Sequence, residues 1–323
     1  MRGCRASARR HPVEEAVGDT RDTDTSDTSD AEDTDDTDDT DDTDDTDDTD
    51  EKRSDRMRRT AWFPFPGRSA GGVELLCLPH AGAGASAYRA WATGLEHSGV
   101  TACPVQPPGR ERRRDEPPFT DVRPLARALA DEIAEVITGP FALFGHSTGA
   151  LCAFETARQL RRIGGPRPAH LFVSGRPAPH LPLDRHDLAG MSLPELTETL
   201  RRLGGTPESV LSQQGLLAAL QPVLAADFSV NEVYDHRTEP ALDIPITAFA
   251  GEQDGGAGPR DTAAWAEHTT RSFRLHVLEG GHFAVFAHAE RVHALVAEAL
   301  ADCVSPARGS AGHVDTQQEE LSR

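Results

Sequence analysis

Cysteine is scarce in this chain of 323 residues, and long apolar runs are absent. The five cysteines form no C-x-x-C pair and no spacing typical of a disulfide framework, so we expect free thiols in a reducing, cytoplasmic location. No stretch of about 18 apolar residues occurs, so no transmembrane helix is expected. The arginines of the N-terminus have no apolar stretch behind them, which argues against a secretory signal peptide. The cysteines are Cys4, Cys77, Cys103, Cys152 and Cys303.

Sequence patterns typical of metal, nucleotide and nucleic-acid binding are also missing. The His, Asp and Cys residues show none of the usual spacings of metal ligands. Gly82 and Gly84 are not followed by Lys-Ser/Thr and belong to no G-x-G-x-x-G, so no phosphate-binding loop is expected. The net charge of −20 disfavours nucleic-acid binding. We therefore expect no metal, no cofactor and no nucleic-acid partner.

The acidic charge is concentrated at the N-terminus. Residues 1–56 hold 22 of the 53 acidic and 8 of the 33 basic residues, and residues 33–50 are a nearly unbroken Asp-Asp-Thr repeat. A segment this polar cannot bury enough apolar surface to offset the conformational entropy lost on folding. We therefore predict a disordered tail over 1–56. A folded domain is predicted over 57–306 and a second disordered tail over 307–323. Met57, where ordinary composition begins, is inferred to be the real or an alternative start.

Short apolar runs alternate with helical patterns along the predicted domain, which is typical of an α/β protein with a largely parallel sheet. Strands are predicted at 73–78, 141–144, 171–173, 246–250 and 273–278, and helices at 120–137, 150–162 and 289–303. Residues 177–239 are predicted to be helical, with breaks at Pro194, Gly204-Gly205 and Pro207. We interpret this insertion as a lid over an active site at the carboxyl ends of the strands; the alternative is an ordinary crossover of several helices.

A G-x-S-x-G pattern, Gly145-His146-Ser147-Thr148-Gly149, lies between a predicted strand and a predicted helix. A serine at such a sharp turn needs small neighbours, because its strained backbone brings adjacent residues close together. The context therefore predicts Ser147 as a nucleophile rather than a structural turn serine.

A serine hydroxyl needs a base, and in this architecture the chain order is serine, acid, histidine. His282 follows Gly280-Gly281 directly after the last predicted strand, so we predict it as the base. His276 and His268 lie inside a predicted strand and helix, and we expect their side chains to point into solvent.

The acid that orients the base is predicted to be Asp254, on the carboxyl side of strand 246–250. Asp243 precedes that strand and Asp261 is expected to begin a helix. Glu252, two residues before Asp254 on the same loop, remains a competitor.

Two backbone N–H groups are expected to bind the oxyanion that forms during such a reaction, each typically contributing a factor of about 10² to 10³ in rate. One is that of Thr148, after the nucleophile, and the other that of Ala81, in the loop after an early strand. His80, beside Ala81, is expected to pack against the turn without transferring a proton.

Taken together, these motifs resemble the type II thioesterases that accompany modular polyketide and nonribosomal peptide synthetases. The similarity spans about residues 60–300. It implies an α/β-hydrolase fold with a small helical lid and a triad of Ser147, Asp254 and His282. The motifs that carry it are Leu78-Pro79-His80-Ala81-Gly82, Gln106-Pro107-Pro108-Gly109-Arg110-Glu111, Gly145 to Ala150, Ser174-Gly175-Arg176, Leu203-Gly204-Gly205-Thr206-Pro207 and Gly280-Gly281-His282-Phe283.

One residue and two short segments bear on the resemblance. Thr148 stands where the family often has Met, which changes the side-chain volume beside the nucleophile. Four small residues, 255–258, are expected to make the loop after Asp254 flexible and to loosen the acid. Residues 174–176 lack the carboxylate that chain-terminating thioesterase domains often carry there, which favours a free-standing hydrolytic enzyme.

The resemblance implies that the substrate is an acyl thioester on the phosphopantetheine arm of an acyl or peptidyl carrier protein, and that the enzyme removes stalled or incorrect acyl groups. A monomer is expected. Such carriers are usually acidic, so a basic docking patch is expected, and Arg110, Arg112, Arg113 and Arg114 are one candidate for it; the alternative is an exposed arginine-rich loop that is merely solvated. The acidic tail would repel the carrier. The alternatives are a general serine esterase, an acyltransferase, and a partner-binding protein without catalysis.

Overall fold

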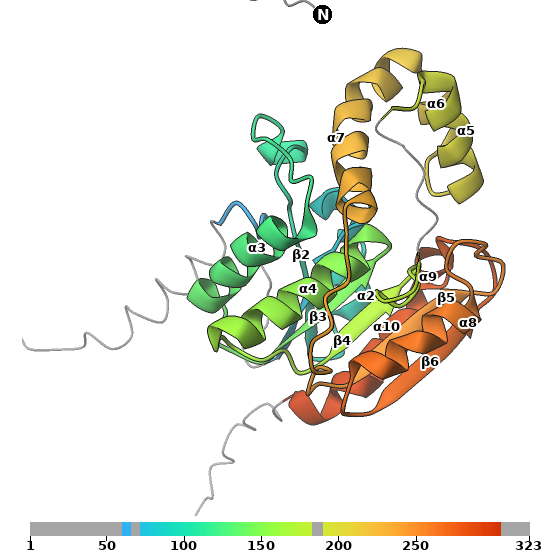
Figure 1. Ribbon diagram of the computed structural model, residues 1–323. Helices are drawn as coiled ribbons and strands as arrows, with labels where there is room; N and C mark the ends of the chain where they lie inside the picture. The colour runs from blue at the N-terminus through green and yellow to red at the C-terminus, as the bar shows by residue number, and fades with distance from the viewer. Residues whose placement is uncertain (1–59, 66–71, 183–189, 305–323) are drawn as a thin grey trace, which may run out of the picture. The chain divides into compact units, whose positions relative to one another are not determined.

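A computed structural model describes residues 60–65, 72–182 and 190–304 of the chain. The predicted tails and Met57 lie outside these residues. Six parallel strands form one sheet in the order β2-β1-β3-β4-β5-β6 (Figure 1). They are β1 (Val73–Leu78), β2 (Val100–Pro104), β3 (Phe141–His146), β4 (Leu171–Ser174), β5 (Ile246–Gly251) and β6 (Phe273–Leu278).

Helices cover both faces of this sheet (Figure 1). Alternate side chains of β1 point to opposite faces: Leu76 and Leu78 pack with α3 (Val122–Val136) and α4 (Thr148–Ile163). Leu75 and Cys77 pack with α2 (Trp91–Leu95) and α10 (Ala289–Leu300). Within the described residues, no helix is long and apolar enough to cross a membrane.

Short helices complete the chain between these elements. They are η1 (Ala85–Tyr88), η2 (Glu111–Arg113), α8 (Pro259–Ala263), η3 (Ala264–His268), α9 (Ala284–Ala287) and η4 (Ala301–Cys303).

Three helices are inserted between β4 and β5: α5 (Leu193–Leu203), α6 (Glu208–Leu211) and α7 (Gln214–Glu232). Their inner faces form an apolar cluster that includes Leu196, Leu217 and Phe228. Ser192 and Glu195 cap the start of α5 reciprocally. Pro194 lies in that first turn, where its missing N–H costs nothing, so the predicted break at Pro194 is wrong. The parallel sheet between two helical layers confirms the predicted α/β-hydrolase fold.

Candidate active site

Ser147 alone makes the turn between β3 and α4. Its backbone has φ 55° and ψ −119°, in a region that residues with a side chain rarely adopt. The Ser147 N–H donates to the carbonyl oxygen of Ser174 at 2.8 Å, which ties the turn to the end of β4. The serine is therefore held in a strained conformation at the carboxyl edge of the sheet.

The two glycines of the G-x-S-x-G pattern are required by close approaches of the backbone. A Cβ on Gly145 would lie 2.2 Å from the Gly149 carbonyl oxygen, and one on Gly149 would lie 2.2 Å from that of Leu78. Both distances are well inside van der Waals contact with atoms that cannot move aside. The small neighbours predicted from the sequence are thus explained by contacts across the turn.

His282 and Asp254 form a hydrogen-bonded pair beside this turn. His282 Nδ1 lies 2.8 Å from Asp254 Oδ2, and Asp254 is 7% exposed. Burial raises the pKa of Asp254, but the hydrogen bond and charge of His282 outweigh it and hold the pKa below its usual value. The carboxylate is therefore ionised at neutral pH and favours a proton on Nδ1, which leaves Nε2 free to accept one.

The loop of small residues after Asp254 fixes the acid rather than loosening it. The N–H groups of Gly256 and Ala257 donate to Asp254 Oδ1 at 3.0 and 3.2 Å. The competitor Glu252 is exposed. Asp243 is also at the surface, where its carboxylate accepts hydrogen bonds from Arg271.

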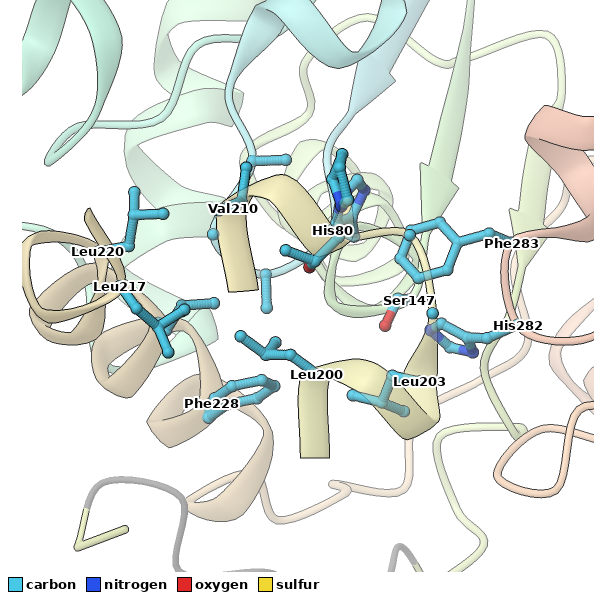
Figure 2. Close-up of a pocket in the computed structure, with 18 of the residues that line it drawn as sticks. His80, Ser147, Leu200, Leu203, Val210, Leu217, Leu220, Phe228, His282 and Phe283 are labelled. Carbon is cyan, nitrogen blue, oxygen red and sulfur yellow. The ribbon is translucent and has the colours of Figure 1, made fainter. Parts of the chain in front are cut away.

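Ser147 and His282 line one cavity of about 460 Å³, which the inserted helices cover. In Figure 2 the Ser147 hydroxyl lies beside the His282 ring, and Phe283 lies above both. The cavity extends from the serine between α5, α6 and α7, where its wall is apolar. Seven side chains form that wall: Leu200, Leu203, Val210, Leu217, Leu220, Leu224 and Phe228.

The end of β4 has no acid and instead positions a second buried histidine. Ser174 Oγ lies 2.6 Å from His146 Nδ1. Gly175 has φ 59°, and a Cβ there would lie 2.5 Å from His146 Cε1 and 3.2 Å from His282 Cε1. Gly175 thus keeps space for both rings, and the carboxylate that contacts His282 comes from the loop after β5.

His80 packs edge-on against His146 and Phe283, as predicted. Burial and the neighbouring His282 lower the pKa of His80 to about 4. The ring is therefore neutral at physiological pH and adds no charge beside Ala81.

The N–H groups of Ala81 and Thr148 each lie next to a backbone N–H that is engaged in a hydrogen bond. Gly82 N–H donates to Asp227 Oδ2 at 2.7 Å, and Ser147 N–H is also engaged. Among the described residues, neither Ala81 N–H nor Thr148 N–H has a hydrogen-bond partner. One free donor therefore directly follows Ser147, and the other lies in the loop after β1 that lines the same cavity.

Comparisons with known proteins identify a family for this chain. The thioesterase domain family matches residues 73–300. The chain belongs to this family.

Relatives of this thioesterase are named for biosynthetic pathways. Gramicidin S biosynthesis protein GrsT of Aneurinibacillus migulanus is 40% identical over 68% of the chain and 85% of the relative. RedJ, a thioesterase from the prodiginine pathway of Streptomyces coelicolor, is 41% identical with a TM-score of 0.66, covering 75% of this chain and 94% of RedJ. The type II thioesterase BorB from the borrelidin cluster is 36% identical with a TM-score of 0.68, covering 75% of this chain and 98% of BorB. These similarities confirm the predicted relationship to type II thioesterases and the predicted activity, thioester hydrolysis.

Arg110 was expected to be exposed, either in a candidate docking patch or in a solvated loop, and the structure contradicts both interpretations. Arg110 is 8% exposed, and its guanidinium binds Asp227 of α7 through two hydrogen bonds of 2.6 and 2.8 Å. Arg113 is mostly covered, because it binds Glu116 and stacks over Trp62. Of the predicted patch in this thioesterase, Arg112 and Arg114 remain exposed.

The predicted solvent exposure of His268 is also wrong. His268 ends the 3-10 helix η3, is 9% exposed, and its Nε2 lies 2.8 Å from His180 Nδ1. His276 lies on β6 and is half-buried against Phe249.

Asp227 and Asn231, which no sequence motif predicted, reach the loop after β1 and the turn at Ser147 from α7. Asn231 Nδ2 donates to Thr148 Oγ1 at 2.8 Å. The one local sign of their importance is that two polar residues lie four apart in a mostly apolar helix, where they share one face.

Proposed function

We propose that this thioesterase removes acyl groups from the phosphopantetheine arms of acyl or peptidyl carrier proteins during polyketide or nonribosomal peptide synthesis. Support comes from the relatives in such pathways and from the apolar cavity, which suits an acyl chain. Removing stalled or incorrect acyl groups would return the carrier thiol to use.

In the proposed mechanism Ser147 is the nucleophile, His282 the base and Asp254 the residue that orients the base. Ser147 Oγ attacks the thioester carbonyl carbon as its proton passes to His282 Nε2. The carbonyl electron pair moves onto oxygen, where the Ala81 and Thr148 N–H groups stabilise the negative charge. The C–S bond then breaks, and His282 gives its proton to the departing sulfur.

The second half of the reaction repeats these steps with water. His282 takes a proton from water as the oxygen attacks the acyl-serine, and the Ser147 oxygen then leaves with that proton. Serine, histidine, aspartate and two backbone amides supply every group required, so the proposal includes no metal or cofactor. We place the reaction in the cytoplasm, with the enzyme as a monomer that meets its carrier near Arg112 and Arg114.

One observation carries this proposal: a serine in a strained turn shares a cavity with a histidine that is hydrogen-bonded to a buried aspartate. The test is mass spectrometry of carrier proteins loaded with acetyl, propionyl and longer acyl groups. Wild-type enzyme is expected to release the acids. Ser147→Ala is expected to do so at least about 10³-fold more slowly, because the covalent step is lost.

Ser272→Ala, which changes an exposed serine before β6, is the matched control and should retain wild-type activity. Equal persistence of the acyl groups with wild type and Ser147→Ala would overturn the proposal. A higher kcat/KM for simple esters than for acyl carriers would indicate a general esterase, and transfer of the acyl group to an added alcohol an acyltransferase.

A further inference from the structure

One face of α7 contacts two segments near Ser147, namely the loop that follows β1 and the first residue of α4. Leu224, Asp227 and Asn231 have the spacing that places three side chains on one face of a helix. Leu224 packs so closely on Gly82 that a Cβ at that glycine would lie 2.6 Å from Leu224 Cδ2. The lid helix therefore contacts the backbone of the loop that carries Ala81.

Asp227 fixes this loop by a hydrogen bond. Its Oδ2 accepts the Gly82 N–H at 2.7 Å, while the Arg110 guanidinium binds both carboxylate oxygens. Asp227 is 6% exposed and Arg110 8% exposed, so solvent screens the pair little. The Arg110 Nε also donates to the Pro108 carbonyl at 3.1 Å, which holds the guanidinium in place. The carboxylate consequently restrains the peptide between Ala81 and Gly82, which adjoins the peptide that carries the Ala81 N–H.

Asn231, one turn further along α7, contacts Thr148 at the start of α4. Arg176 donates from Nη1 to Asn231 Oδ1. Because arginine only donates, the amide must face it with its oxygen, which turns the Asn231 Nδ2 toward the Thr148 hydroxyl and the Asp227 carbonyl. Thr148, where the resembled family often has Met, supplies the oxygen that accepts this bond.

We infer that Asp227 and Asn231 are positioning residues that set the two oxyanion donors, Ala81 N–H and Thr148 N–H, from the lid helix. The inference rests on the proposed function, in which those two groups bind the oxyanion. Donors must lie within hydrogen-bond reach of the oxyanion, and misplacement by about 1 Å can cost about 10² in rate. The hydrolysis rate therefore depends on how α7 sits on the body of the enzyme.

A matched pair of double variants separates positioning from simple structural support. Arg110→Met with Asp227→Asn removes both charges but keeps an oxygen for the Gly82 N–H. Arg110→Met with Asp227→Leu removes both charges and that oxygen. Neither variant leaves an unpaired buried charge, which is the change most damaging to folding.

Hydrolysis of the octanoyl thioester of N-acetylcysteamine is the assay, with the thermal midpoint as the folding control. The Asn-containing variant is expected to keep kcat within about threefold of wild type. The Leu-containing variant is expected to lose about tenfold or more in kcat with KM within about twofold, since one donor is misplaced only in part. A trifluoromethyl ketone with an octyl chain, which forms an oxyanion adduct with serine, should bind the Leu-containing variant more weakly by a similar factor. Octanol, which forms no adduct, should bind both equally.

Equal kcat for the two double variants at equal thermal midpoints overturns the role of Asp227. If the Leu-containing variant does not fold, comparing Thr148→Val with Thr148→Ser tests the inference through the contact with Asn231. Valine keeps the shape and the backbone donor but removes the oxygen that Asn231 binds, so kcat should fall at least about fivefold, while serine should restore it. Equal rates for Val and Ser variants overturn the inference. Undiminished hydrolysis by Ser147→Ala in this assay would instead refute the proposed function.

Discussion

Two residues with side chains, Ser147 and Glu111, have a positive φ among the described residues, and Ser147 lines the cavity. Glu111, at φ 49°, accepts hydrogen bonds from the N–H and hydroxyl of Ser86, which lines the cavity. Left-handed backbone at such residues costs roughly 1 to 3 kcal/mol and persists where surrounding contacts enforce it. The hydrogen bonds of Glu111 and the close packing around Ser147 are those contacts.

Buried neutral histidines make the folded state sensitive to acid. The clearest case away from the cavity is His170, which is 6% exposed, stacks on Phe172 and lies 2.9 Å from Thr247 Oγ1. Burial, followed by the charge of Arg274, lowers its pKa to about 4. Between the ordinary histidine pKa of about 6.5 and this value, the unfolded chain binds a proton that the folded protein does not.

The free energy of unfolding should therefore be highest above pH 6.5 and fall as the pH drops from about 6.5 toward 4. His170→Gln keeps a polar partner for Thr247 but does not titrate. Over that window the variant should lose less stability than wild type, by about 3 kcal/mol at most. Urea unfolding at pH 7.5, 5.5 and 4.5 measures this. Parallel pH curves for the two proteins would show that His170 does not titrate as argued.

At the scale of elements, the segment that joins α5 to α6 contacts Phe283, the residue next to His282. Gly204 and Gly205 have φ 78° and 79°, and a Cβ on Gly205 would lie 2.4 Å from the Phe283 ring. Phe283 is adjacent to His282 and packs against its ring at 5.2 Å. The glycine pair thus allows the lid to pack against Phe283, which in turn packs against His282.

Gly205→Ala should lower both stability and activity. A left-handed alanine costs about 1 to 2 kcal/mol, and the clash with Phe283 adds to this. Displacement of Phe283 and His282 should lower kcat/KM for the octanoyl thioester by about tenfold, since small misplacements in the site are costly.

Gly215→Ala is the control in the same lid. A Cβ there meets nothing within 4 Å, and the residue lies in the first turn of α7. Alanine should be neutral or stabilise by about 0.5 to 1 kcal/mol. Urea unfolding and thioester hydrolysis check both variants, and equal behaviour of the two would contradict the contact argument.

Local sequence patterns predicted the strands and turns whose structure depends mainly on residues close together in the sequence. The five predicted strands are present, and the contexts of Ser147, His282 and Asp254 follow from the turns that end β3, β6 and β5. Strand β2 was missed because it has five residues, ends in proline and lies at the sheet edge. Its parallel pairing with β1 is a tertiary contact that no local pattern predicts.

The same limit explains the error at Arg110. An arginine in a run of arginines has the sequence context of a solvated surface residue. Its partner Asp227 lies 117 residues away, on a helix of the lid, so only the fold brings the two together. Residues that act through long-range contacts, including Asn231 on Thr148, are the ones that sequence reasoning missed.

At the scale of the whole molecule, charge is distributed very unevenly. Residues 1–56 carry a net charge of −14, and the remaining 267 residues carry −6. The described residues that form the cavity all come after residue 56. The acidic segment can thus influence catalysis mainly through its effect on encounters with a charged partner.

A chain that begins at Met57 should therefore differ from the full chain in kcat/KM only when the substrate is charged. With an acidic acyl carrier at about 10 mM salt, where the screening length is about 30 Å, the shorter chain should show a several-fold higher kcat/KM because it repels the carrier less. At about 0.15 M salt the screening length falls to about 8 Å and the difference should largely disappear. Toward the octanoyl thioester of N-acetylcysteamine, which is uncharged, both chains should react equally at either salt concentration. Slower hydrolysis of this small thioester by the shorter chain would mean that residues 1–56 support the catalytic domain itself, and an advantage that persists at high salt would mean that they obstruct the carrier by bulk rather than by charge.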